Sequence, residues 1–227
     1  MSSQPKAADR AYVRIRDKLL DGEYTSGHLL SEGTVATDLG VSRTPVREAF
    51  QRLQTEGFLR VYPKRGAVVV PVGPDDAHGV LQARLLLELF ALDSLAARGP
   101  EAMREVGSAL LRDCEEEQKQ TTPASAREFG REFHIRLMRA AGNPVLGELY
   151  ETLWNRQLRI AAAATAGPDH AAADMAEHAG IAAALHDQRP AEARELLTDH
   201  LAGVLHRTGF SGRPSLPPAA GVDGLWP

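Results

Sequence analysis

Hydrogen-bond donors gather at the beginning of one amphipathic segment, LGVSRTPVREAFQRL (39–53). Its apolar residues recur at helical spacing and predict a buried face made of Val46, Ala49, Phe50 and Leu53. Arg43 and Arg47 lie one helical turn apart, so both project from the other side of the helix. Arginine pairs bidentately with O6 and N7 of guanine, and a helix enters the major groove with its first turns against the bases. The segment therefore predicts a helix that reads DNA.

Two hydroxyl side chains stand beside these arginines. Ser42, Thr44 and the free amides of a first helical turn can hold a phosphate group, assisted by the helix dipole. Either residue also suits the N-cap, because Thr44 precedes Pro45 and Ser42 is a comparable cap. The spacing leaves both starting points open.

A two-stranded ribbon is predicted to follow this helix. After Gly57 the hydrophobic period changes to alternation, so FLRVYP (58–63) and AVVVPV (67–72) predict two strands. The turn between them contains Lys64 and Arg65, which would reach the DNA backbone or minor groove, and Gly66, which permits a tight turn.

Two further helices are predicted before the DNA-reading one. Residues 9–22 carry an apolar stripe, and residues 31–40 form a shorter pattern that Ser31 can cap and Gly40 can end. Three helices followed by a ribbon are the outline of a winged helix-turn-helix domain, assigned to residues 1–72.

The remainder of the chain predicts a separate helical domain. No strand pattern occurs between about 75 and 208, and breaks at Gly and Pro divide this part into six helices: 75–98, 101–121, 124–141, 144–166, 169–187 and 190–208. The fold class is therefore mainly α, a winged helix-turn-helix followed by an all-α bundle. The Gly- and Pro-rich residues 209–227 are expected to be disordered.

Composition excludes several classes of protein. No run of apolar residues in the 227-residue chain is long enough for a transmembrane helix, and the N-terminus lacks a signal-peptide core. The single Cys114 cannot form an internal disulfide, so a cytoplasmic protein without membrane contact is expected. Residues 1–72 hold 11 Lys and Arg against 8 Asp and Glu, whereas the rest hold 15 against 22. Only the N-terminal part is therefore expected to meet a polyanion.

The N-terminal part resembles a known family of regulators. The stretch LLDGEYTSGHLLSEGTVATDLGVSRTPVREAFQRLQTEGFLRVYPKRGAVV is similar to the winged helix of the GntR family of bacterial transcription regulators. The resemblance implies DNA contacts from Ser42, Arg43, Thr44 and Arg47 in the helix, and from Arg65 and Gly66 in the wing. Gly33 departs from the family, many members of which have an arginine or another polar residue there.

The helical part resembles the FCD-type domain of the FadR subfamily, in RLLLELFALDSLAA (84–97), EFHIRLMRAAGNPVL (132–146) and AEHAGIAAALHDQRPAEA (176–193). Such domains enclose a small metabolite, often a carboxylate, and many hold a metal ion. The resemblance implies metal ligation by His134, His178 and His200, which suits zinc or a similar divalent ion.

One ligand of the family pattern is missing. The family has an aspartate one turn before the first histidine, where this chain has Gly130. Three outcomes follow: water or the effector's carboxylate fills the position, Asp174 supplies a substitute oxygen, or no metal binds.

Arg84 is the candidate effector-binding residue. It matches an arginine of the family pattern and can clamp a carboxylate bidentately. The alternative is an ion pair with Glu88, one turn away, on the surface of the helix.

These features predict a metabolite-responsive transcription regulator, a repressor by analogy. Its partners are a palindromic operator in double-stranded DNA, a small organic acid and a second copy of the chain in a homodimer. A metal-dependent helical enzyme with a three-histidine site is the alternative, but no general base or nucleophile motif accompanies the histidines, so the chain is predicted not to be an enzyme. A winged helix that only docks proteins is disfavoured by the placement of the donors.

Overall fold

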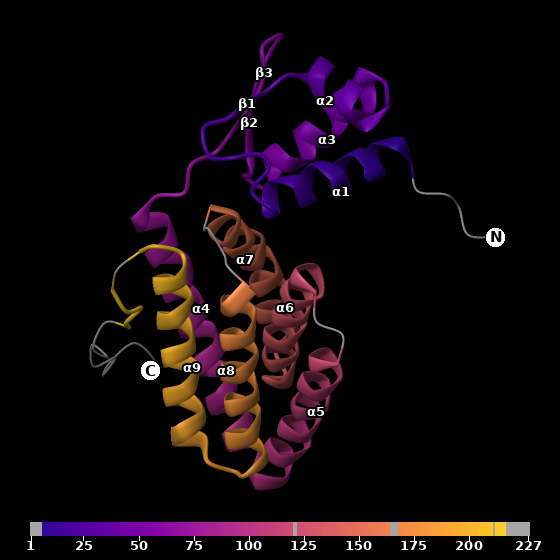
Figure 1. The fold of residues 1–227 in the computed structure, drawn as a ribbon. Coiled ribbons are helices and arrows are strands. Elements are labelled where there is room, and N and C mark those ends of the chain that lie inside the picture. Colours follow the sequence, from indigo (N-terminus) through magenta and orange to yellow (C-terminus); the bar gives the residue numbers. More distant parts are fainter. Residues whose placement is uncertain (1–5, 120–121, 164–167, 211, 217–227) are drawn as a thin grey trace, which may run out of the picture. The chain divides into compact units, whose positions relative to one another are not determined.

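The computed structural model describes residues 6–119, 122–163, 168–210 and 212–216. The chain divides into two compact units, residues 1–76 with 155–165, and residues 77–154 with 166–227. Nine helices and one small sheet are formed by the described residues (Figure 1). The mainly helical fold class is confirmed.

Three helices form the core of the N-terminal unit: α1 (Ala7–Leu20), α2 (Glu32–Leu39) and α3 (Arg43–Thr55). Ser31 caps α2, accepting from the amide of Thr34 at 3.5 Å, and Gly40 ends it in the left-handed conformation, as predicted. Helix α3 packs on α1 through a buried apolar cluster that includes Ile15, Val46, Phe50 and Leu53. This packing fixes the polar side of α3 toward solvent.

The sheet contains one strand more than the sequence predicted. β2 (Leu59–Tyr62) and β3 (Gly66–Val69) pair antiparallel as expected, and β1 (Leu29–Leu30) pairs with the other edge of β3. The segment around β1 was predicted only as a turn. Two residues are too few to produce a periodic pattern, so pairing with β3, not local sequence, makes this segment a strand.

Six helices follow in the sequence, each beginning at a proline, and most of their residues belong to the second unit. They are α4 (Pro74–Ala97), α5 (Pro100–Gln118), α6 (Pro123–Ala140), α7 (Pro144–Ala163), α8 (Pro168–His186) and α9 (Pro190–Arg207). Proline suits a first helical turn, because its missing N–H has no intrahelical partner there and its φ is already helical. The six predicted helices are confirmed, with bounds shifted by a few residues at most.

The backbones of helices α5 and α8 lie close together at Gly107. A Cβ at this position would lie 2.3 Å from the backbone nitrogen of His186 and 2.8 Å from the carbonyl oxygen of Ala182. Only a residue without a side chain allows these two backbones to come so near.

The first residues of the C-terminal tail lie against the bundle. Ser215 accepts a hydrogen bond from Gln82 of α4 at 2.7 Å, Arg213 pairs with Asp199 of α9 at 2.6 Å, and Pro214 is buried. Residues 217–227, also expected to be disordered, are outside the described residues. Across the described part of the chain, no helix combines the length and the apolar character that a bilayer span requires.

Candidate functional site

The beginning of α3 presents the predicted DNA-contacting residues to solvent. Ser42 is the N-cap, so Arg43 is the first helical residue and the alternative start at Thr44 is wrong. Ser42, Arg43, Thr44 and Arg47 are all exposed, whereas Val46 and Phe50 are fully buried. The separation of donors from apolar residues therefore holds in three dimensions.

Arg47 is held by an acidic residue of the preceding helix. Its Nε donates to Oε1 of Glu32 at 3.1 Å and its Nη2 donates to Oε2 at 2.7 Å. This pairing lowers the pKa of Glu32 and raises that of Arg47. Glu32 was not among the predicted site residues, because its contact with Arg47 joins two helices and leaves no local pattern in the sequence.

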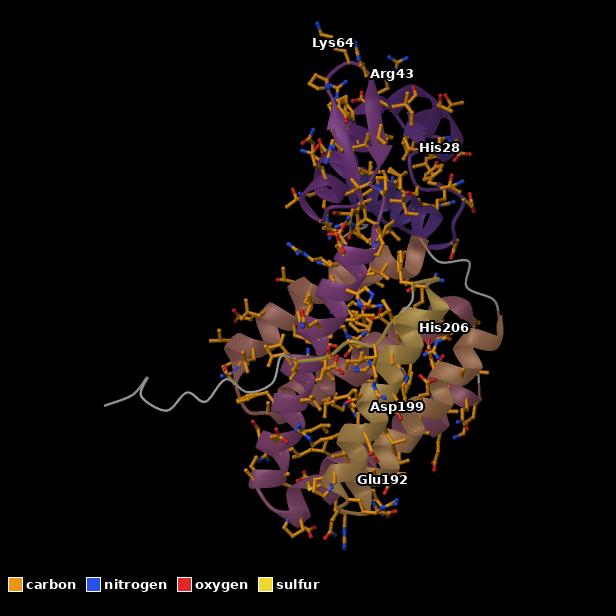
Figure 2. All side chains as sticks on the ribbon, turned by 90° about the vertical axis from the view of Figure 1, so that its left-hand side faces the viewer. His28, Arg43, Lys64, Glu192, Asp199 and His206 are labelled. Carbon is orange, nitrogen blue, oxygen red and sulfur yellow. The ribbon has the colours of Figure 1, made fainter. Side chains whose placement is uncertain are left out.

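The wing contains a backbone conformation that side chains rarely adopt. Lys64 has a φ of 62°, within a turn that the amide of Arg65 closes by donating to the carbonyl of Tyr62 at 3.0 Å. Lys64 lies at the same end of the N-terminal unit as Arg43 (Figure 2).

Gly66 has a structural role in the sheet. Its φ is 105°, and a Cβ there would lie 2.1 Å from the carbonyl oxygen of Leu30 in β1. Any side chain at residue 66 would prevent β1 from pairing with β3. The pairing alone therefore explains the glycine, without a contact to DNA.

The second unit brings the three predicted histidines together in its interior. Nε2 of His134 lies 3.2 Å from Nε2 of His200 and 3.1 Å from Nε2 of His178 (Figure 1 shows the source helices α6, α8 and α9). All three side chains are buried. Two nitrogens bound to one tetrahedral zinc ion are separated by about 3.3 Å, given zinc–nitrogen bonds of about 2.0–2.1 Å. These nitrogens therefore fit a shared divalent metal ion.

Carboxylates orient two of these imidazoles. Nδ1 of His134 lies 2.8 Å from Oε2 of Glu88, and Nδ1 of His200 lies 2.7 Å from Oε2 of Glu177. An imidazole that donates through Nδ1 keeps the lone pair of Nε2 for a metal ion. The third ring differs, since Nδ1 of His178 has no partner among the described residues.

Burial keeps two of the rings neutral. Desolvation lowers the pKa of His134 to about 4, although Glu88 opposes this shift, and lowers that of His178 well below its usual value. Burial alone would raise the pKa of Glu88, but Arg84 and His134 outweigh it and hold that carboxyl ionised. Neutral imidazoles beside an ionised carboxylate are the protonation states that metal ligation requires.

The position of the missing ligand lies beside the cluster. A Cβ at Gly130 would lie 3.7 Å from Cε1 of His178. Asp174, the suggested substitute, is instead paired with Arg207. Its carboxylate instead forms a second possible metal-holding group with the carboxylate of Glu177 and the imidazole of His200, so it shares only His200 with the three-histidine set.

Arg84 is paired with Glu88, but inside the bundle. Its Nε donates to Oε1 of Glu88 at 2.9 Å, and Tyr150 donates to the same oxygen at 2.7 Å. Arg84 is 1% exposed and Glu88 fully buried, so the predicted alternative of a surface ion pair is wrong. The pair is expensive to bury, and such pairs need further hydrogen bonds to satisfy their remaining atoms.

Two donors close to this pair have no partner. Nη2 of Arg84 and Nε1 of Trp154 are both buried without a hydrogen-bond partner in the described part of the chain. Cζ of Arg84 lies 4.9 Å from the centroid of the Trp154 ring. The ring centroids of Trp154 and His134 are 5.7 Å apart. Tyr150, Trp154 and Glu177 were not among the predicted site residues. Only Glu177, which directly precedes His178, had a local signal in the sequence.

Comparison with known proteins matches two family models to the chain. Residues 7–69 match the family described as bacterial regulatory proteins, gntR family, and residues 79–203 match the FCD domain. An HTH-type transcriptional regulator from the TAR-I ttuE-ttuC' intergenic region of Agrobacterium vitis is 37% identical over 47% of this chain and 61% of its own length. The gluconate operon transcriptional repressor of Bacillus subtilis is 36% identical over 41% of this chain and 38% of its own length.

A solved structure supports the fold. A putative GntR transcriptional regulator from Rhodococcus sp. RHA1 superposes with a TM-score of 0.64 at 22% identity, covering 88% of this chain and 97% of that one. The two sequence relatives are matched over less than two thirds of their lengths. Both are transcriptional regulators, in agreement with the prediction that this chain is not an enzyme.

Proposed function

The chain belongs to the FCD-domain family and has an N-terminal domain of the gntR family of bacterial regulatory proteins; on this premise we propose that it binds DNA and regulates transcription. The combination of the two domains supports membership of the FadR subfamily. The observation that carries the proposal is the exposed first turn of α3, where Ser42, Arg43, Thr44 and Arg47 offer donors above a buried apolar face. Lys64 and Arg65 extend the same surface toward phosphates.

Binding to DNA upstream of the chain's own gene tests this proposal. Arg43→Ala and Arg47→Ala should each weaken binding by about 1–3 kcal/mol, because each removes a base-reading guanidinium. Arg14→Ala, which removes an exposed arginine from α1, is the charge-matched control. Wild-type affinity in both α3 variants would contradict the assignment of the recognition helix.

We further propose that the helical unit binds a small carboxylate effector together with a divalent metal ion. His134, His178 and His200 would hold the ion, which would supply a Lewis-acid contact to the carboxylate. The unpartnered donors of Arg84 and Trp154 support an effector with carboxylate oxygens, because buried polar groups in proteins are nearly always satisfied.

Metal analysis and ligand titration test the sensing proposal separately. Protein purified without chelator should contain zinc or a similar ion, and folded His134→Ala should not. A panel of mono- and dicarboxylates should raise the melting temperature of the metal-loaded protein, and Trp154→Phe, which removes one N–H and keeps the ring, should weaken that effect. Equal metal content in wild type and His134→Ala would end the metal proposal, and no response to any carboxylate would end the effector proposal.

The proposed regulator is a homodimeric repressor that its effector releases from DNA. A two-fold protein matches a palindromic operator, and the Bacillus subtilis relative is named as a repressor. Effector binding can change DNA affinity only if the effector prefers one arrangement of the two recognition helices. Light scattering should give twice the chain mass, and the effector should weaken operator binding; a monomer or a strengthened complex would contradict this form.

A further inference from the structure

Glu32, the first residue of α2, forms a surface ion pair with an arginine of α3. Both of its oxygens accept from Arg47, at 3.1 and 2.7 Å. The side chain of Arg47 nevertheless stays 62% exposed. Ion pairs at such exposed positions contribute little to stability. A contribution to the stability of the fold therefore does not explain why Glu32 and Arg47 are paired.

The contact leaves one edge of the guanidinium available. Glu32 uses Nε and one N–H of Nη2, so Nη1 and the second N–H of Nη2 are not engaged by the carboxylate. These two groups form the fork that pairs with O6 and N7 of guanine. Glu32 thus restricts a long side chain to one orientation before DNA arrives, which lowers the entropy lost on binding.

The arginine that begins α3 has no such support. The guanidinium of Arg43 lies beside Gly33, with Nη2 at 3.3 Å and Cζ at 3.6 Å from the position of a Cβ at that residue. Its charge acts on Glu32 through space, but among the described residues no hydrogen bond or ion pair orients its guanidinium as Glu32 orients that of Arg47. Gly33 therefore leaves room for the guanidinium of Arg43 but does not hold it. Of the two arginines proposed to read bases, only Arg47 is oriented by a hydrogen-bonded partner.

Resting on the proposed DNA binding, we propose that Glu32 is a positioning residue for sequence recognition. It holds Arg47 so that α3 discriminates guanine at one base pair of each half-site. Discrimination by Arg43 at its own base pair does not depend on Glu32.

The test uses the full-length protein and a random-sequence duplex library. The duplex that the wild type enriches is compared with all its single-base-pair variants, and Arg47→Ala and Arg43→Ala identify the base pair that each arginine reads. Glu32→Gln should reduce discrimination at the Arg47 base pair by roughly fivefold or more and leave the Arg43 base pair unchanged. Affinity for non-specific DNA should stay the same or rise, because a negative charge near the phosphates is removed.

Glu48→Gln is the matched control, because Glu48 is an exposed glutamate on α3 and its substitution removes the same charge. This variant should keep wild-type discrimination at both base pairs. In an Arg47→Ala background, Glu32→Gln should have no further effect, since the residue acts through Arg47.

Two results would overturn the proposal: wild-type discrimination in Glu32→Gln, or an equal loss at both base pairs, which would indicate a general role in α2. If the wild type enriches no duplex, DNA binding itself fails instead.

Discussion

Nδ1 of His134 and Oε2 of Glu88 lie 2.8 Å apart in the interior of the helical unit, with both side chains at most 1% exposed. Glu88 also accepts from Arg84 and Tyr150 through its other oxygen. One carboxylate therefore joins the candidate metal ligand to the candidate effector-binding arginine. A substitution at His134 or Arg84 therefore changes the contacts of a carboxylate that the other residue also uses.

Glu88→Gln should destabilise the protein strongly. The amide cannot neutralise Arg84, and breaking a buried ion pair by removing one partner costs about 3–5 kcal/mol. Urea unfolding of the metal-free protein measures this loss. Replacing the pair together, as Arg84→Met with Glu88→Leu, should restore much of the stability; a double variant as unstable as Glu88→Gln would contradict this reasoning.

Glu177→Gln should lower metal affinity while sparing the fold. Glu177 orients His200 but remains partly exposed, and loss of such an orienting partner costs about 10–100-fold in metal affinity. Competition with a zinc chelator measures the change. Glu192→Gln, in the first turn of α9 (Figure 2), removes the same charge away from the histidines, and this variant should bind metal normally.

Gly130→Asp should increase metal affinity by roughly tenfold or more, since it adds a carboxylate to three imidazoles. The new Cβ makes only ordinary contact with His178. Gly130→Ala is the control, because it raises helix propensity without adding a ligand. Equal affinity in the two variants would place residue 130 outside the coordination sphere.

Lys64→Gly should stabilise the protein and weaken its binding to DNA. The left-handed conformation of Lys64 costs about 1 kcal/mol, which glycine avoids. Loss of one phosphate contact should reduce the salt dependence of DNA binding by about one unit of slope. Lys64→Gln keeps the backbone strain and loses the charge, so it should weaken DNA binding without the gain in stability.

Gly107→Ala should destabilise the helical unit by about 1–3 kcal/mol or more, because the methyl group would overlap the backbone of α8. Gly79→Ala in α4, where nothing lies within 4 Å, should instead be neutral or stabilising. Denaturant midpoints compare the two. Similar effects would mean that α5 and α8 are not closely packed at residue 107.

Local signals predicted most of the elements. Proline begins each helix of the second unit, glycine ends α2, and the apolar stripe of α3 defines its buried face. β1 gave no such signal, because its two residues become a strand only by pairing with β3 across an intervening chain segment. The choice of N-cap for α3 stayed open for a similar reason. Ser42 and Thr44 are both good caps by local sequence, and the packing of the whole domain decides in favour of Ser42.

The amino-acid sequence specifies the types and order of the functional residues: arginines and hydroxyls at the beginning of α3, a basic wing, and three histidines on three separate helices. Only the tertiary structure decided which groups meet. It brought the three Nε2 atoms together, buried Arg84 with Glu88, engaged Asp174 with Arg207 and paired Glu32 with Arg47. The physical reason is that helical periodicity specifies a face within one helix, whereas contacts between helices depend on how their faces pack across long stretches of chain.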